Sequence, residues 1–409
     1  MDGRTHGQER GTPRRGGLAR ALERRLEGAR RDLAMLYRTL TGAPAPPLVR
    51  ENTRGERGGV EAQLVTVTEV VQETADAVRL HLRASAPLVW EAGQFLTLHV
   101  EVDGVRHRRA YSIAAAPGDP GDPCVVVKRV AGGVVSGYLV ENARVGQRFV
   151  FRGPSGRFVV SPESAAGAHH VLIGGGSGVT PLVAIARALL RDRPAARVTV
   201  LTGSRRPGDI ILRGALLALS EAHPERLALR FAVEEAGADD VSADDRGGLA
   251  LGRLDAALLA RELGATHADD AWYYVSGPEG MLDAARAYLR GAGVADARIL
   301  EERFVSLATE RRVGDVDLAP APATIRRAGG DEVTTIVPRG ASILDAGLRA
   351  GAAMPFSCTM GGCGACRARL VAGDVVLDAP NCLGADERDD GYILTCVAHP
   401  VGPVVVEVP

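Results

Sequence analysis

Residues 171–190, VLIGGGSGVTPLVAIARALL, set a glycine-rich turn between an apolar run and a helical pattern. Glycines let the backbone approach a phosphate closely, and a helix N-terminus offers free N–H groups and a favourable dipole. Alone the signal is weak, because tight strand-to-helix turns also use glycine for packing. The form Gly176-x-Gly178-x-x-Pro181, with Thr180 inside it, differs from the G-x-G-x-x-G fingerprint of dehydrogenases. The stretch therefore predicts a strand-turn-helix unit with a candidate nucleotide-phosphate site.

Strand and helix patterns keep alternating after this turn, up to about residue 310. ARVTVLTGS (196–204) and AWYYVSGP (271–278) read as strands, and MLDAARAYLRGAG (281–293) reads as a helix. Such alternation predicts a parallel sheet covered by helices on both faces.

The preceding residues, from 60 to about 161, carry short β-branched runs separated by Gly, Pro and Asp turns. QLVTVTEVV (63–71), QFLTLHVEV (94–102) and CVVVKRV (124–130) are examples. Strands at this spacing predict a small antiparallel β-barrel.

The C-terminal ninety residues return to strands and contain FSCTMGGCGACRARL (356–370), just beyond a predicted helix at 341–352. Four and then two residues separate Cys358, Cys363 and Cys366, and Cys396 follows after twenty-nine more. This is the plant-type [2Fe-2S] spacing. Glycines at 361, 362 and 364 let a loop wrap a cluster with its N–H groups turned to the sulfides.

Three alternatives fit this cysteine loop less well. Zinc sites usually show two C-x2-C pairs or histidine ligands. A redox dithiol would precede a helix, whereas a strand pattern, RARLVAG (367–373), follows Cys366. Plain core cysteines do not need this spacing among glycines. Cys124 and Cys382 fall outside the ligand pattern, although Cys382 could lie near the cluster.

Composition indicates an ordinary globular protein. The chain has 409 residues, 46% apolar content and a net charge of -1, so we expect two to four domains and no overall preference for nucleic acid. No run of eighteen apolar residues occurs and residues 1–17 lack the apolar core of a secretory signal, which favours the cytoplasm.

The first 59 residues hold thirteen Arg against seven Asp or Glu and end in a Pro-rich stretch. Within them, residues 18–40 carry a leucine stripe at helical spacing. This basic helix either packs on its own protein or docks on a membrane surface or partner.

Four motifs together resemble the ferredoxin-NADP reductase superfamily: HRRAYSIAAAP (107–117), GGVVSGYL (132–139), the GxGxxP turn and YYVSGPEGM (273–281). The tail resembles a plant-type ferredoxin. In this order the chain resembles the reductase components of bacterial oxygenase and desaturase systems. The resemblance implies a leader (1–59), an antiparallel β-barrel flavin domain (60–165), an α/β parallel-sheet nucleotide domain (166–310), a linker (311–321) and an α+β, β-grasp ferredoxin domain (322–409).

By that resemblance, Arg109 meets a flavin phosphate, Tyr111 lies against the isoalloxazine and Ser112 hydrogen-bonds near flavin N5. These residue types suit a phosphate, a ring face and a nitrogen that accepts hydride. The second phosphate segment is Gly133, Val134, Val135 and Ser136, whose N–H groups and hydroxyl meet the pyrophosphate. The resemblance implies FAD, with FMN as the alternative.

The resemblance also implies that Gly176, Gly178, Thr180 and Pro181 receive the nicotinamide dinucleotide. Gly277 and Pro278 lie near the nicotinamide, and Ser276 stands where the family usually has cysteine. Glu302 and Phe304 match an E-x-F ending at the flavin edge. Ser112, Ser276 and Glu302 are thus the candidate catalytic residues.

LTGSRRPGDI (201–210) places Ser204, Arg205 and Arg206 after a strand, where they would meet the adenosine ribose. A hydroxyl and guanidinium suit a 2′-phosphate, and no carboxylate follows until Asp209, which favours NADPH over NADH. His169, His170 and His399 are expected to be surface or hydrogen-bonded core residues, and ADERDD (385–390) a solvated loop.

The predicted function is electron transfer from NAD(P)H through flavin and a [2Fe-2S] cluster to a separate protein. Desaturases, oxygenases and cytochromes P450 are candidate acceptors, and the basic helix favours a membrane-associated one. The alternatives are a redox-responsive binding protein with little turnover and a diaphorase that reduces small acceptors.

Overall fold

The computed structural model describes residues 63–235, 248–264, 271–303, 318–327, 330–356, 358–378, 381–383 and 385–409. All of them belong to one compact unit of the chain, residues 49–409. The predicted leader with its helix at 18–40 lies outside the described residues, as do Phe304 and most of the predicted linker.

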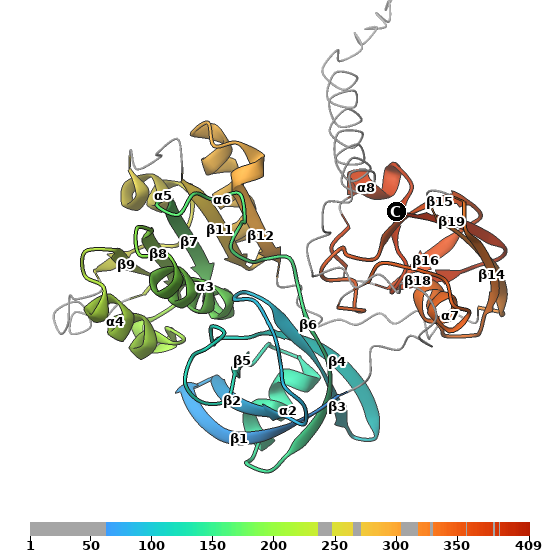
Figure 1. Ribbon diagram of the computed structural model, residues 1–409, viewed down its shortest axis with the longest axis horizontal. Helices are drawn as coiled ribbons and strands as arrows, with labels where there is room; N and C mark the ends of the chain where they lie inside the picture. The colour runs from blue at the N-terminus through green and yellow to red at the C-terminus, as the bar shows by residue number, and fades with distance from the viewer. Residues whose placement is uncertain are drawn as a thin grey trace, which may run out of the picture. The chain divides into compact units, whose positions relative to one another are not determined.

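Six antiparallel strands form the first sheet, in the order β4-β3-β6-β1-β2-β5 (Figure 1). A further bridge between Ile113 and Val125 joins the chain after β4 to β5 and closes the sheet into a barrel. In β2 the buried Leu80 and Leu82 alternate with Arg79, His81 and Arg83, as expected of a strand with one face in the core. The elements are β1 (Gln63–Thr74), β2 (Ala77–Ala84), β3 (Phe95–Val102), β4 (Val105–Ser112), β5 (Cys124–Lys128), α2 (Val134–Asn142) and β6 (Arg148–Ser155).

A second sheet is entirely parallel, with the order β10-β9-β8-β7-β11-β12. All seven residues of its central strand, β7 (His169–Gly175), are buried, because helices cover both faces. The other strands are β8 (Arg197–Ser204), β9 (Leu227–Val233), β10 (Leu249–Leu251), β11 (Trp272–Gly277) and β12 (Ile299–Arg303).

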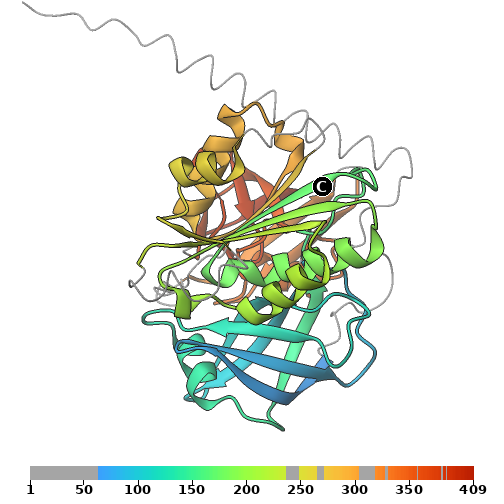
Figure 2. The ribbon, with the colours of Figure 1, turned by 90° about the vertical axis from the view of Figure 1, so that its left-hand side faces the viewer.

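Helices α3 (Val179–Asp192) and α4 (Arg213–Ala222) cover one face of this sheet, and α5 (Ala256–Leu263) and α6 (Glu279–Gly291) cover the other (Figure 2). The α3 side shares one continuous hydrophobic core with the barrel, since Leu182 and Leu172 belong to the same cluster as Val65. The barrel and the parallel sheet therefore pack as one body around a common core.

The strand order of the parallel sheet reverses beside β7. The chain runs outward through β8 and β9, then returns to place β11 on the other side of β7. Ligands of open α/β sheets bind in the crevice outside the carboxyl ends of the strands at such a reversal. The glycine turn after β7 and the segment Ser276–Pro278 after β11 both lie at this point.

The C-terminal part has its own core and a mixed five-stranded sheet, β14-β13-β19-β15-β17, with a small β16-β18 ladder. Ala321, Ala323 and Ile325 of β13 are buried at every second position, and α7 (Ile343–Arg349) packs on that face. The strands are β13 (Ala321–Arg327), β14 (Glu332–Val337), β15 (Arg367–Ala372), β16 (Val375–Leu377), β17 (Tyr392–Leu394), β18 (Ala398–Pro400) and β19 (Val404–Val408).

One local expectation was wrong: the ADERDD stretch is not a plain loop. Residues Ala385–Asp389 form a short helix, α8, and Glu387 pairs with Arg367 at the start of β15. Among the described residues, no helix is long and apolar enough to cross a membrane.

Candidate functional site

The glycine turn after β7 forms a single 3-10 turn, η1 (Gly176–Gly178), that leads into α3. Gly178 packs tightly on β11, because a Cβ there would lie 2.1 Å from the carbonyl oxygen of Ser276. Gly176 has a φ of 54°, and a Cβ there would meet nothing within 4 Å. The turn is thus held against β11 on one side and faces open space on the other, as a dinucleotide would require.

Two hydroxyls beside this turn are buried without a protein partner. Thr180 is 2% exposed and Ser276 is 0% exposed, and neither Oγ has a hydrogen-bond partner within the described part of the chain. A buried hydroxyl left unpaired costs stability. The two hydroxyls are therefore suited to hydrogen-bond with polar atoms of a ligand in the crevice. Pro181 directly follows Thr180, and Gly277 and Pro278 directly follow Ser276.

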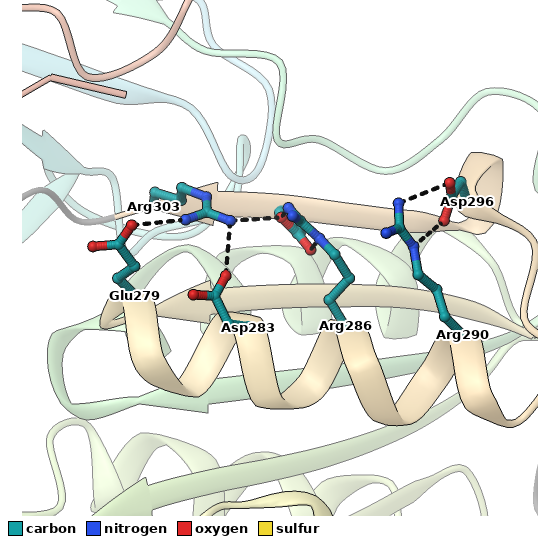
Figure 3. Close-up of polar contacts among 7 residues, drawn as sticks. Glu279, Asp283, Arg286, Arg290, Asp296 and Arg303 are labelled. Atoms are coloured by element: carbon teal, nitrogen blue, oxygen red, sulfur yellow. Dashed lines mark hydrogen bonds and ion pairs between the residues drawn. The ribbon is translucent and has the colours of Figure 1, made fainter. Parts of the chain in front are cut away.

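Strand β12 is fixed to α6 by a network of charged side chains (Figure 3). Arg303 lies 3.3 Å from Glu279 and 3.1 Å from Asp283, and Arg286 pairs with Glu301. Because successive strand residues point to opposite faces, anchoring Glu301 and Arg303 on α6 turns Glu302 to the other face of β12.

On that other face Glu302 meets the barrel. Ser112 Oγ, at the end of β4, donates a hydrogen bond to Glu302 Oε2 at 3.2 Å. Burial raises the pKa of Glu302 to about 8, the hydrogen bond from Ser112 opposes that rise, and the nearby Cys363 adds to it. Two of the three predicted catalytic residues are thus in contact, and the third, Ser276, lies on the neighbouring strand β11, opposite Glu302 in register.

Arg109 and Tyr111 precede Ser112 on β4. Arg109 Nη1 donates to the carbonyl oxygen of Arg108 at 2.7 Å. Burial raises the pKa of the Tyr111 phenol, and Arg109 lowers it in part, so the guanidinium and the ring are neighbours. A cation beside an aromatic face suits a flavin phosphate and ring.

The second predicted phosphate segment is the start of α2. Gly133 occupies the N-cap position and no side chain caps the helix, so the N–H groups of Val134, Val135 and Ser136 open the first turn without intrahelical partners. The Ser136 hydroxyl is already used: it accepts from Val130 N at 3.1 Å and donates to Gly133 O at 3.4 Å. Backbone N–H groups therefore suit an anion here better than this hydroxyl does.

The predicted ribose contacts follow β8, and a carboxylate that the sequence reasoning missed lies beside them. Arg206 Nε donates to Glu235 Oε2 at 2.8 Å, and Glu235 N donates to Arg205 O at 2.8 Å. Adjacent parallel strands bring their carboxyl ends together, so Glu235 after β9 reaches Arg206 across 29 residues of sequence. Ser204 is half-buried and Arg205 is exposed.

The four candidate ligand cysteines form two pairs. Cys366 and Cys396 have their sulfurs 3.1 Å apart, and Cys358 N donates to Cys363 Sγ at 3.5 Å. Within the described ranges no group of three or more His, Cys, Asp or Glu side chains is arranged so that it could hold a single metal ion. Two sulfurs for each of two irons is the set that a [2Fe-2S] cluster takes.

Backbone N–H groups of the loop already point at these sulfurs. Gly361 N donates to Cys396 Sγ at 3.2 Å and Met360 N to Cys358 Sγ at 3.4 Å. Cys363 is exposed, whereas the other three are buried. The loop therefore has the donors that tune an iron-sulfur cluster and one ligand position near the surface.

The two remaining cysteines differ in their surroundings. A Cβ on Gly364 would lie 3.7 Å from Cys382 Sγ, and Cys382 N donates to Gly361 O, so Cys382 borders the ligand loop. Burial and the neighbouring thiols raise its pKa to about 12. Cys124 is a core residue of the barrel.

The histidine expectation holds for two residues and was wrong for one. His169 contacts Thr199, and His399 contacts Asp378 and Ala341 O. His170 is fully buried, yet neither ring nitrogen has a hydrogen-bond partner among the described residues.

Three family models match the chain in the order of its parts. They are described as oxidoreductase FAD-binding domain (residues 61–160), oxidoreductase NAD-binding domain (172–287) and 2Fe-2S iron-sulfur cluster binding domain (327–401). These matches confirm the predicted fold classes and the predicted FAD, nicotinamide dinucleotide and [2Fe-2S] cofactors.

Relatives cover most of the chain. The sequence is 33% identical to a component of the 1,2-phenylacetyl-CoA epoxidase of Escherichia coli (strain K12), over 84% of this chain and 96% of that protein. It is 32% identical to the ferredoxin reductase component of 3-ketosteroid-9-alpha-monooxygenase from Mycolicibacterium smegmatis, over 83% and 94%. Among solved structures, the ferredoxin reductase in carbazole 1,9a-dioxygenase is similar with a TM-score of 0.52 and 29% identity, covering 64% of this chain and 71% of that chain.

Proposed function

Because the chain belongs to the family of oxygenase reductase components with FAD-binding, NAD-binding and [2Fe-2S] domains, we propose that it passes electrons from NAD(P)H to a separate oxygenase, desaturase or cytochrome P450. Flavin accepts two electrons as hydride and releases them singly, which a one-electron cluster requires. The chain's own residues bind, orient and shield these groups.

The flavin is held by β4 and by the start of α2. Arg109 and the N–H groups of Val134 and Val135 bind its phosphates, and Tyr111 lies against its ring. Ser112 lies at the flavin N5 edge, and because its proton is donated to Glu302 at 3.2 Å, its oxygen is held there as an acceptor. This assignment is supported by the convergence of β4 and β12, which come from different sheets.

The dinucleotide lies in the crevice at the carboxyl ends of β7 and β11. Gly176 and Gly178 let the backbone approach it, and the unpaired hydroxyls of Thr180 and Ser276 bind its polar atoms. Ser204 and Arg205 bind a 2′-phosphate, which favours NADPH. Arg206 is already paired with Glu235, so one carboxylate remains at the ribose site and NADH is also accepted.

The observation that carries the proposal is the arrangement of the cysteines in two sulfur pairs, with Cys358 beside Cys363 and Cys366 beside Cys396. A diaphorase acting on small acceptors would not need a one-electron site after its flavin. A binding protein with little turnover would not need the nucleotide crevice next to Ser112 and Glu302.

The test uses the purified full chain under anaerobic conditions. We expect flavin and iron-sulfur absorption, rapid bleaching of both by NADPH, and reduction of cytochrome c. Absence of flavin would refute the proposal. Full cofactor loading without NAD(P)H turnover would also refute it and would favour the binding-protein alternative.

The acceptor is one redox protein of the oxygenase, desaturase or P450 kind, and capture by the reduced chain from its own cell extract identifies it. A cytoplasmic location with peripheral membrane contact through residues 18–40 stays a prediction. Deleting residues 1–58 and measuring vesicle binding and acceptor turnover tests it, and unchanged values would contradict it.

A further inference from the structure

Two arginines lie close together on one face of the flavin barrel. Arg108 on β4 is opposite His99, and Arg152 on β6 is opposite Thr97. His99 and Thr97 are two residues apart on the shared strand β3, so Arg108 and Arg152 point to the same side. Leu98 between them points to the other side, into the barrel core, where it is fully buried.

This pair is unfavourable within the barrel alone. The Nε of Arg152 is buried and has no hydrogen-bond partner among the residues that the structure describes. Burial lowers the pKa of Arg152, and the like charge of Arg108 lowers it further. A partly buried guanidinium whose Nε is unpaired, next to a second guanidinium, is stabilised by a negative or polar group from elsewhere.

The [2Fe-2S] domain supplies both groups. Arg108 Nη1 donates to Thr359 Oγ1 at 3.3 Å, and Thr359 directly follows the cluster cysteine Cys358. The negative charge of Asp345 on α7 acts on Arg152 from a distance: it raises the pKa of the guanidinium, although less than burial and Arg108 lower it. Ser342 is the N-cap of α7: its hydroxyl oxygen accepts a hydrogen bond from Asp345 N at 3.1 Å. This bond fixes the backbone that carries the Asp345 carboxylate.

We propose that Arg108 and Arg152 form an electrostatic latch that docks the chain's own [2Fe-2S] domain, through Thr359 and Asp345, onto the flavin barrel. The latch rests on the proposed function, because its purpose is to hold the cluster loop beside the flavin for transfer of one electron. The reduced flavin gives up one electron, and the oxidised cluster gains that electron. Arg108 and Arg152 are positioning residues and take no part in the hydride step.

The latch consists of one hydrogen bond and one pair of opposite charges. Contacts of this kind are individually modest and, where they reach solvent, weaken with added salt. Losing one of them should lower the docked fraction, and with it the flavin-to-cluster rate, by roughly tenfold. Docking is therefore reversible, and release of the domain frees the Cys363 side of the loop, which lies near Glu302 in the docked state, to meet an acceptor protein.

The test compares the cofactor-loaded full chain with five variants: Arg108→Gln, Arg152→Glu, Asp345→Arg, the double variant Arg152→Glu/Asp345→Arg, and the control Arg148→Gln. Arg148 is exposed on the same strand, β6. The first readout is hydrogen exchange of the amides in 148–155 and 343–349. The second is anaerobic stopped-flow absorbance, which follows flavin reduction by NADPH and cluster reduction separately.

We expect faster amide exchange and roughly tenfold slower cluster reduction in Arg108→Gln, Arg152→Glu and Asp345→Arg, with flavin reduction unchanged. The double variant should recover both readouts, and the control should match wild type. Wild-type exchange and cluster reduction in Arg108→Gln and Arg152→Glu would overturn the latch. If Arg152→Glu loses flavin, Arg108→Gln and Asp345→Arg decide the question. Failure of wild type to reduce its flavin or cluster would instead refute the proposed function.

Discussion

Ser112 and Glu302 are 190 residues apart in sequence, yet the Ser112 hydroxyl donates to the Glu302 carboxyl group at 3.2 Å. The contact joins the last residue of β4 in the barrel to β12 at the edge of the parallel sheet. It exists because Arg303 and Glu301 anchor the opposite face of β12 on α6 (Figure 3). The residue proposed for flavin N5 is therefore held by the domain that binds the hydride donor.

Replacing Glu302 tests this arrangement. Glu302→Leu should slow flavin reduction by NADPH about ten- to hundredfold, because Ser112 loses its buried acceptor and its hydroxyl turns away from N5. Glu302→Gln should lose much less, since an amide is uncharged, accepts the same hydrogen bond and has nearly the same size. Anaerobic stopped-flow measurement gives both rates. Equal rates for Glu302→Leu and wild type would show that the contact is only structural.

Replacing Cys363 separates the two electron-transfer steps. Cys363→Ser should abolish cytochrome c reduction, because a serine oxygen is a poor substitute for a thiolate on iron. Flavin reduction by NADPH should stay close to wild type, since the variant keeps the contact of Ser112 with Glu302 and replaces the neighbouring thiol by a side chain of similar size. Cys382→Ser is the matched control: it borders the same loop but lies outside the ligand spacing, so its cluster spectrum should survive.

The ion pair between Glu235 and Arg206 predicts a change in coenzyme preference. Glu235→Gln frees Arg206 and removes a negative charge beside the ribose, so we expect the KM for NADPH to fall roughly tenfold and that for NADH to change little. Arg206→Gln should instead raise the KM for NADPH, because it leaves the Glu235 carboxylate unpaired beside the 2′-phosphate. Steady-state kinetics with both coenzymes checks this, and an equal change for both would contradict it.

The sequence alone predicted those features that depend on local spacing. The turn at Gly176–Gly178 and the four-cysteine pattern follow from short motifs, because a phosphate cradle and a cluster loop each impose a fixed order of glycines and ligands. The contact of Glu235 with Arg206 could not be predicted in this way. It depends on which strands are neighbours in the sheet, and the two residues are separated by a whole helix and strand.

Other features depend on packing between distant segments. The pairing of Arg108 with Thr359 spans 251 residues, and neither of the motifs that contain them, 107–117 and 356–370, says which distant segment lies against it. The use of the Ser136 hydroxyl within its own turn is also invisible in sequence, because serine at a helix start can equally bind a ligand. Short charged stretches such as 385–390 can form a loop or a helix, and the ion pair of Glu387 with Arg367 accompanies the helix here.

His170 predicts how the stability of the barrel and nucleotide core depends on pH. The ring is fully buried beside Tyr274, and neither nitrogen has a hydrogen-bond partner among the described residues. Burial lowers the pKa of His170 from 6.5 to about 4, with smaller contributions from Arg193 and His169. In the unfolded chain the ring binds a proton when the pH falls below its ordinary pKa of 6.5. In the folded chain the ring stays neutral until the pH falls to about 4.

Stability should therefore be unaffected by this group above its unfolded pKa and should fall as the pH drops from 6.5 towards 4. The loss should be on the order of 3 kcal/mol across that window. His170→Leu should remove this part of the acid sensitivity and also raise stability at neutral pH, because it replaces two unpaired nitrogens by apolar atoms in an apolar site. Urea unfolding followed at about pH 5 and about pH 7.5 measures both effects. His81, which is partly exposed, provides the control: His81→Gln should keep the wild-type dependence of stability on pH. If His170→Leu also kept that dependence, groups other than His170 would be the cause of the acid sensitivity.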